Sequence, residues 1–175
     1  MAVVHTVESQ GESHRGAGVV AVFQRAIARL AWLAGLVAPP LARIALAVPF
    51  FRSGLTKWSG FLTLSPAADY LFEEQFKLHW FGRAYDFPAP DILAYLDGVA
   101  EVVLPVLLVI GLGTRLSALG LLLMTGVIQL TVPSAWATFH ILWAALAVAI
   151  MAMGPGPLSL DHVIARWVQR STVAR

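Results

Sequence analysis

Cysteine is absent from this chain of 175 residues, and charged residues make up only 13% of it. The lack of cysteine excludes disulfides, thiolate catalysis, iron–sulfur clusters and cysteine-type zinc sites within the chain. The scarcity of charge, with 58% hydrophobic residues and a mean hydropathy of +0.75, excludes an ordinary soluble domain. We therefore expect an integral membrane protein, in which any redox role must come from a bound cofactor or a partner.

Motifs that define an enzyme class are missing as well. The five histidines are scattered, with no His-x-x-x-His pair for a metal, and no glycine-rich loop could cradle a phosphate. The formal net charge of +2 is too small to indicate a nucleic-acid partner. Whether the chain is an enzyme at all is therefore left open by its motifs.

The first 38 residues precede the most apolar part of the chain. Residues 1–18 are small and polar and lack the basic start and apolar core of a signal peptide, which predicts a flexible tail. Residues 19–38 place apolar side chains at helical spacing with the basic ones on another side, which predicts an amphipathic helix lying in the membrane interface. In the alternative, residues 19–37 cross the membrane too. Pro39-Pro40 is expected to end this helix.

A transmembrane domain is predicted over residues 39–153. The hydrocarbon core of a bilayer is about 30 Å thick and needs about 20 apolar residues in a helix. Four segments approach that length: residues 41–58, 92–110, 116–130 and 136–153. The first crosses only if Arg43 and Lys57 snorkel toward the two interfaces.

The remaining segments lie between and after these helices. Residues 59–91 form an acidic, aromatic outer loop, in which Ser65-Pro66 followed by Asp69 predicts a short helix from Pro66 to about Lys77. Residues 154–175 hold a second amphipathic helix, capped by Ser159, and a tail. The fold class is therefore all-α: a four-helix transmembrane bundle with amphipathic interfacial helices at both ends and a short helix in the outer loop.

Positive charge orients this bundle. Basic residues gather in the N-terminal segment, at Arg115 and in the C-terminal helix, whereas residues 59–91 are acidic and the turn at Pro133 is uncharged. The positive-inside rule then places both termini in the cytoplasm.

Polar side chains from all four predicted helices fall in the outer half of the membrane. At 1.5 Å per residue from the outer helix ends, Arg52 lies about 10 Å deep, Glu101 about 13 Å, Asp97 about 7 Å and His140 about 6 Å. We expect Arg52 to pair with Glu101, because a guanidinium can bind a carboxylate through two hydrogen bonds. Asp97 would then reach Lys57 or His140.

These depths define a candidate pocket. Arg52, Glu101 and His140 would line it and handle protons or a quinone carbonyl. The residues expected to contact a substrate are Lys57, Asp97, Gln129 and Trp136. No metal-ligand set is assigned, although His140 is a possible ligand for a metal or a haem. The competing interpretation is that paired charges only fix the register of the helices and that the tryptophans form an interfacial belt.

Four stretches carry a family resemblance: Leu41 to Lys57, Gly98-Val-Ala-Glu101, Gly111-Leu-Gly-Thr-Arg115 and Gly154-Pro-Gly-Pro-Leu-Ser-Leu-Asp-His162. Together they resemble the DoxX family of small bacterial inner-membrane proteins. The resemblance implies a bacterial inner (cytoplasmic) membrane protein that crosses the bilayer several times, surrounded by lipids and working with a protein partner or a second copy of itself.

The same resemblance implies two functions. The family takes its name from a subunit of a thiosulfate:quinone oxidoreductase, so the first is a membrane subunit that supports quinone-linked oxidoreductase chemistry. The acidic loop around Tyr70-Leu-Phe-Glu-Glu74 and the turn Gln129-Leu-Thr-Val-Pro133 are similar to a branch found beside biosynthesis genes for metal-binding peptides. The alternative is therefore a non-enzymatic membrane partner that handles or exports a metal or a metal-binding modified peptide. A quinone is the cofactor implied first, and a haem or metal ion the alternative.

Overall fold

Helices dominate the structure. The computed structural model describes residues 4–173, and the side chains of residues 20–172, and the chain is 78% helical. Within that part of the chain, four helices are long and apolar enough to cross a membrane: Val20–Thr56, Pro90–Ile110, Thr114–Thr131 and Pro133–Met153. The prediction of four apolar membrane helices is thereby confirmed.

The first helix, α1 (Val4–Thr56), is longer than predicted. It continues through Pro39, Pro40 and Pro49, so the expected end at Pro39-Pro40 is wrong. A proline inside a helix removes the hydrogen bond to the carbonyl four residues earlier, and its ring crowds that carbonyl, but membrane helices tolerate both when other groups satisfy the freed carbonyl. The chain nevertheless divides at this point into two structural units, one ending at Val37 and the other beginning at Ala38.

The predicted flexible tail, residues 1–18, is also helical where the structure describes it. From Val4 onward these residues belong to α1, and residues 1–3 lie outside the described part. No proline precedes Pro39, and an isolated glycine costs a helix only about 1 kcal/mol, so nothing in this stretch ends the helix. Whether residues 19–38 lie in the interface or cross the membrane stays a prediction.

Two β-hairpins in the outer loop were not predicted. β1 (Trp58–Gly60) pairs with β2 (Thr63–Leu64), and β3 (Lys77–Trp80) pairs with β4 (Arg83–Asp86), both antiparallel. Runs this short give too little alternation to be read from a sequence. The loop is therefore an ordered structure of hairpins and short helices.

Between the hairpins the chain is helical over α2 (Pro66–Tyr70) and a π-helical turn, Leu71–Gln75. The Ser65 hydroxyl accepts a hydrogen bond from the Ala68 N–H, as the Ser65-Pro66 pair predicts for a helix start. The helix stops before Lys77, which opens β3 instead. The side of the membrane on which this loop lies stays a prediction.

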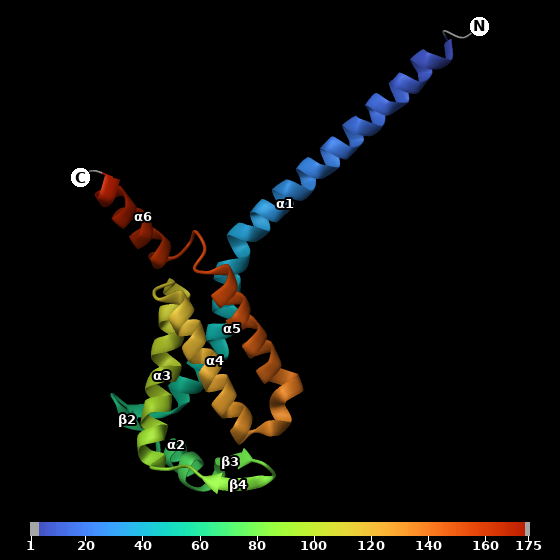
Figure 1. The fold of residues 1–175 in the computed structure, drawn as a ribbon. Coiled ribbons are helices and arrows are strands. Elements are labelled where there is room, and N and C mark those ends of the chain that lie inside the picture. Colours follow the sequence, from blue (N-terminus) through green and yellow to red (C-terminus); the bar gives the residue numbers. More distant parts are fainter. Residues whose placement is uncertain (1–3, 174–175) are drawn as a thin grey trace. The chain divides into compact units, whose positions relative to one another are not determined.

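The remaining helices follow in sequence: α3 (Pro90–Ile110), α4 (Thr114–Thr131), α5 (Ile141–Met153) and α6 (Leu160–Val173). A 3-10 turn (Pro133–Ala135) and a π-helical turn (Trp136–His140) precede α5. Figure 1 shows α4 between α3 and α5, and it packs against both. The interfacial position predicted for α6 is untested and stays a prediction.

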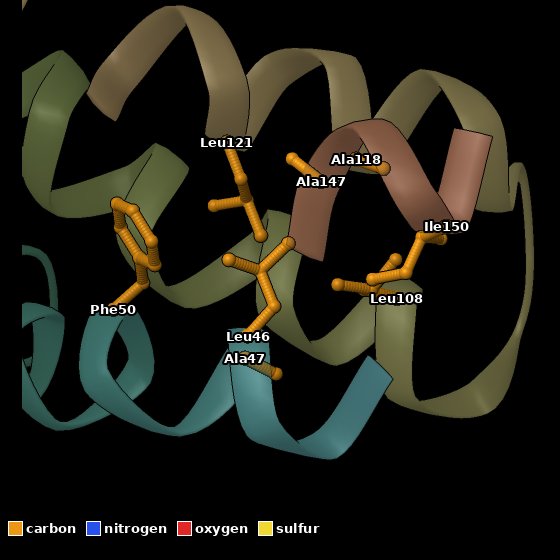
Figure 2. Close-up of a cluster of buried hydrophobic side chains, with 8 residues drawn as sticks. All are labelled: Leu46, Ala47, Phe50, Leu108, Ala118, Leu121, Ala147 and Ile150. Atoms are coloured by element: carbon orange, nitrogen blue, oxygen red, sulfur yellow. The ribbon is translucent and has the colours of Figure 1, made fainter. Parts of the chain in front are cut away.

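A small apolar core holds α1 and its three partners together (Figure 2). Its members are Leu46, Ala47, Phe50, Leu108, Ala118, Leu121, Ala147 and Ile150. Phe50 also packs against Trp143, with ring centres 5.1 Å apart. Alanines at three of the eight positions let the helix backbones approach closely, as is typical of membrane helices. The polar groups of the bundle lie outside this core.

Candidate polar site

The ammonium group of Lys57 lies between two carboxylates of α3. Its Nζ forms ion pairs with Oδ2 of Asp97 and Oε2 of Glu101. The Glu101 side chain is 4% exposed, that of Lys57 10% and that of Asp97 25%. The spacing of four residues puts both acids on one helix face, as predicted. One cation thus bridges a buried acid and a more accessible acid.

Helical periodicity explains why Lys57, the residue after α1, faces α3. Buried positions recur at helical spacing along α1 and into Lys57: Arg43, Leu46, Ala47, Phe50, Gly54 and Lys57. Arg52 is five residues before Lys57, which turns it about 140° away at 3.6 residues per turn. Lys57 therefore continues the buried stripe and Arg52 does not.

Two glycines allow α1 and the following strand to approach α3 at this point. A Cβ atom on Gly54 would lie 2.9 Å from Cβ of Glu101, and one on Gly98 would lie 2.9 Å from Cζ2 of Trp58. Trp58 also packs edge-on against Tyr95, with ring centres 5.4 Å apart. Larger residues at either glycine would push the lysine away from the acids.

Phe72 of the outer loop lies over the lysine. Its ring centre is 5.9 Å from Lys57 Nζ, within range of a cation–π attraction, and Phe72 is only 7% exposed. Phe76 and Phe87 pack around it, with ring centres 5.3 and 5.8 Å away. The loop therefore covers the ion-paired site.

A second polar pair links α4 to the π-helical turn before α5. His140 Nδ1 lies 2.6 Å from Oε1 of Gln129, and Nε2 of Gln129 donates to the Pro133 carbonyl at 3.2 Å. His140 is 3% exposed and lies against Trp143. No hydrogen bond or ion pair joins His140 to Glu101 among the described residues.

A third polar cluster lies at the turn between α3 and α4. Asp161 accepts hydrogen bonds from the Gly113 N–H at 2.8 Å, the Thr114 N–H at 2.9 Å and the Thr114 hydroxyl at 2.8 Å. Arg43 Nη2 donates to the Leu158 carbonyl at 2.5 Å. The first turn of α6 is thus bound to the start of α4, and the segment before α6 is bound to α1.

The charges of this third cluster are held by backbone groups. Burial alone would raise the pKa of Asp161, but the hydrogen bonds from Thr114 and Gly113 and the charge of Arg43 outweigh it and hold that pKa below its usual value. Arg43 was expected to snorkel and is instead 1% exposed. Its Nη1 is a buried nitrogen without a hydrogen-bond partner in the described structure. The expectation that Arg43 snorkels to the interface is therefore wrong, because the carbonyls of Leu158 and Pro39 accept hydrogen bonds from its guanidinium inside the protein.

The residues predicted to form one pocket lie in two separate groups in the structure. Lys57, Asp97 and Glu101 come together, and Gln129 meets His140. Arg52 is exposed, and no ion pair between described residues involves it, so the predicted Arg52–Glu101 pair is wrong. The depth estimate counted the rise along each helix but not the direction around it. Trp136 is 45% exposed and makes no polar contact with either group among the described residues.

Residues that the sequence reasoning missed are Phe72, Thr114 and Asp161. Phe72 carries no signal of its own within an aromatic-rich loop. A signal for Asp161 does exist, because the turn Gly111-Leu-Gly113 offers no side-chain cap to the start of α4. The exposed N–H groups of that helix start require an acceptor from elsewhere, and a later acid is the natural candidate.

The fold and the buried charges define a small helical membrane protein with an ion-paired site at one end of its bundle. The sequence pattern of the DoxX family matches residues 38–134, more than half of the chain, and the chain belongs to that family. The match contains Lys57, Asp97 and Glu101. An uncharacterized protein of Haemophilus influenzae is 28% identical over 146 residues, which cover 71% of this chain and 81% of that protein. No solved structure matches the chain.

Proposed function

We propose that this protein is a membrane subunit supporting quinone-linked oxidoreductase chemistry, with Lys57, Asp97 and Glu101 as its polar pocket. The observation that carries the proposal is a buried ammonium group held between two carboxylates of one membrane helix. This set replaces the Arg52, Glu101 and His140 set expected from depth alone. His140 becomes a separate group bound to Gln129.

The charge balance of the pocket favours proton handling. One ammonium and two carboxylates carry a net charge of −1, and an uncompensated charge in a membrane interior is expensive. Binding of one proton neutralises the group without breaking both ion pairs. Reduction of a quinone to a quinol takes up two electrons and two protons. In this proposal a partner oxidoreductase supplies the electrons, and the pocket passes protons to or from the quinone.

The surroundings of Lys57 fit a quinone. Its ammonium has three N–H donors, of which two face the carboxylates, and the third can donate to a carbonyl oxygen. An apolar cavity of about 270 Å³ lies between α1, α3 and the first hairpin. Trp58, the neighbour of Lys57 in the chain, lines this cavity, whereas the three charged residues do not; its other lining residues are Leu55, Gly60, Phe61, Leu62, Val99, Val102 and Val103. The hydrocarbon tail of a quinone would lie there, with its ring toward Lys57.

A second candidate is a non-enzymatic partner for a metal-binding modified peptide. The observation in its favour is a wide outer-loop pocket of about 750 Å³. Three acids and two tyrosines are among its lining residues: Asp69, Glu73, Asp91, Tyr70 and Tyr95. Among the described residues no group of three or more acids and histidines could hold a metal ion. In this candidate the peptide therefore supplies the metal ligands, and the acidic pocket attracts a cationic part of it.

Gentle solubilisation followed by mass spectrometry and metal analysis tests both candidates. The proposal expects a quinone that co-purifies with the wild-type protein and is lost in Glu101→Gln and Lys57→Met. Arg52→Gln is the matched control, because it removes an exposed charge from the same helix and should leave the quinone bound. A retained metal or peptide without quinone would replace the first candidate by the second. Retention of quinone in both pocket variants would show that the pocket is not its site.

The orientation also belongs to the proposal. We infer an inner-membrane location with both termini in the cytoplasm, on the basis of the positive-inside rule. Reporter fusions after Gly18, Arg115 and Arg170 should read as cytoplasmic, and fusions within residues 69–86 as external. An external reading after Gly18 would show instead that residues 19–37 make a fifth crossing.

A further inference from the structure

The tips of the two outer hairpins carry the most exposed aromatic side chains of the described structure. Phe61 is 93% exposed at the turn between β1 and β2, and Phe81 is 91% exposed at the turn between β3 and β4. Their neighbours Leu62 and Trp80 are 53% and 54% exposed. Water around four such side chains at two turns is unfavourable, so both tips require an apolar environment.

Backbone strain at both tips strengthens this requirement. Leu62 has φ 53°, Phe81 has φ 47°, and Gly82 after it has φ 74°. Two residues with positive φ between paired strands form a turn that favours Asn-Gly, and large side chains disfavour it. A phenylalanine at this position is unfavourable for its backbone and for its exposure. Such outliers point to a functional constraint on the side chain.

Both hairpins are attached to the ends of membrane helices. β1 starts at Trp58, directly after α1 ends at Thr56, and the Ser65 N–H donates to the Lys57 carbonyl at 2.8 Å. The second hairpin is held by His79, whose Nδ1 lies 3.2 Å from the Leu130 carbonyl near the end of α4. Figure 1 shows β2, β3 and β4 near the same end of α3. Since α1 and α4 are both long and apolar enough to cross a membrane, these attachment points place the two hairpins beside the bilayer.

The second hairpin is held together by strand pairing and by side-chain contacts. Four residue pairs join its strands, and Lys77 Nζ forms an ion pair with Asp86 at 2.7 Å. Trp80 packs edge-on against Phe81, with ring centres 5.3 Å apart, and the exposed Arg83 pairs with Trp80 across the strands. An aromatic pair beside a cation is the combination that suits the boundary between acyl chains and phosphates.

We infer that the two hairpins are membrane anchors, which insert Phe61 and Phe81 into the lipid bilayer beside the bundle. The ligand is the phospholipid surface itself, with acyl chains around the phenylalanines and phosphates near Arg83. The anchors hold the outer loop, including Phe72 above Lys57, against the membrane. The inference does not depend on the redox proposal.

The absence of cysteine makes a depth measurement simple, because an introduced cysteine is a unique labelling site. A nitroxide is attached to Ala84→Cys in protein reconstituted into vesicles of phosphatidylcholine and phosphatidylglycerol. Its collisions with oxygen, which concentrates in lipid, are compared with those of a water-soluble nickel chelate. We expect the oxygen-to-nickel ratio to fall several-fold when Phe81→Asn is added. Because asparagine before Gly82 would suit the turn, this variant keeps the hairpin, which an unchanged or raised melting temperature verifies.

Tyr85→Asn is the matched control, since Tyr85 is exposed on the same hairpin but away from the tip. It should change the ratio much less than Phe81→Asn. A label at Thr63→Cys, with and without Phe61→Asn, repeats the measurement on the first hairpin. Equal ratios with and without the tip phenylalanines would overturn the inference. A label shielded from both reagents would overturn it too, because the tips would then lie against a protein partner or a second copy of the chain.

Discussion

The two ion-containing clusters of this bundle hold their charges in different ways. At the turn between α3 and α4, Asp161 is bound by the N–H groups of Gly113 and Thr114, and Arg43 donates to a loop carbonyl. At the other cluster Lys57, Asp97 and Glu101 are bound to one another. Backbone groups and the Thr114 hydroxyl, which also donates to Asp161, do not gain or lose a proton near neutral pH, whereas carboxylates and an ammonium group can. The Asp161 cluster is therefore suited to structure and the Lys57 cluster to chemistry.

The largest effect on stability is expected from removing Lys57, the cation between Asp97 and Glu101. Lys57→Met leaves two neighbouring carboxylates without their partner, and loss of one member of a buried ion pair costs about 3–5 kcal/mol. Lys57→Met combined with Glu101→Gln should cost much less than the sum of the single variants. Unfolding of the detergent-solubilised protein by a denaturing detergent measures each free energy.

Arg52→Met serves as the control for that cycle. As an exposed residue outside the cluster it should change the free energy of unfolding by no more than about 0.5 kcal/mol. Strict additivity of Lys57→Met and Glu101→Gln would contradict the ion pair. A large effect of Arg52→Met would restore the pairing that the depth estimate favoured.

A smaller loss of stability is expected from adding a side chain where α1 lies close to α3. Gly54→Ala places a Cβ 3.0 Å from the backbone carbon of Glu101, which cannot move freely, and such overpacking typically costs about 1–3 kcal/mol. Gly126→Ala is the matched control, because a Cβ there meets no atom within 4 Å. It should be neutral or stabilising, since alanine favours a helix. The same unfolding assay compares them, and equal effects would show that the helices do not meet at Gly54.

Substitution of Asp161 should change the free energy of unfolding as the loss of a helix cap does. Asp161→Ala removes the acceptor of three hydrogen bonds at the start of α4, and loss of a cap costs about 0.5–2 kcal/mol. Asp161→Asn keeps a carbonyl oxygen and should cost less. Thermal unfolding near neutral pH ranks the two variants. An Asp161→Ala variant as stable as wild type would show that α4 does not depend on this cap.

The titration of Asp161 gives the smallest expected effect. Since its folded pKa lies below the usual value, its contribution to stability is fully present above the ordinary pKa of aspartate, about 3.9, and is lost as the pH falls through the lower folded pKa. Wild type should therefore lose stability in acid relative to Asp161→Asn, so that the two melting temperatures converge. A constant difference between them down to the lowest accessible pH would contradict the lowered pKa.

The four apolar helices and the shared helix face of Asp97 and Glu101 were predictable from the sequence. Asp97 and Glu101 could be paired because a spacing of four is a local property of one helix. The partner of Glu101 could not be found from depth, because the depth estimate favoured Arg52 and did not count the direction around α1, in which Arg52 and Lys57 differ by about 140°. The buried stripe from Leu46 through Phe50 to Gly54 carries that direction, and its extension by three residues reaches Lys57.

Contacts between segments far apart in the sequence could not be predicted. The cap that Asp161 gives to Thr114 joins residues 47 positions apart, and no periodicity connects them. The hairpins were not predicted for another reason. The strands β1 and β2 hold only three and two residues, and the turns of the two hairpins place Leu62 and Phe81 where Asn or Gly is usual. A turn with an apolar residue at this position cannot be recognised from the residue types that turns usually contain.

The prolines of α1 have a consequence for the continuity of that helix. Pro39 and Pro40 cannot donate to the carbonyls of Gly35 and Leu36, so two successive hydrogen bonds are missing from one turn of a continuous helix. The second structural unit begins at Ala38, and the family match begins at the same residue. The double proline thus lies at the start of both the family match and the second structural unit. Because two backbone hydrogen bonds are missing there, the helical ladder on one side of the prolines is less tightly coupled to the ladder on the other side.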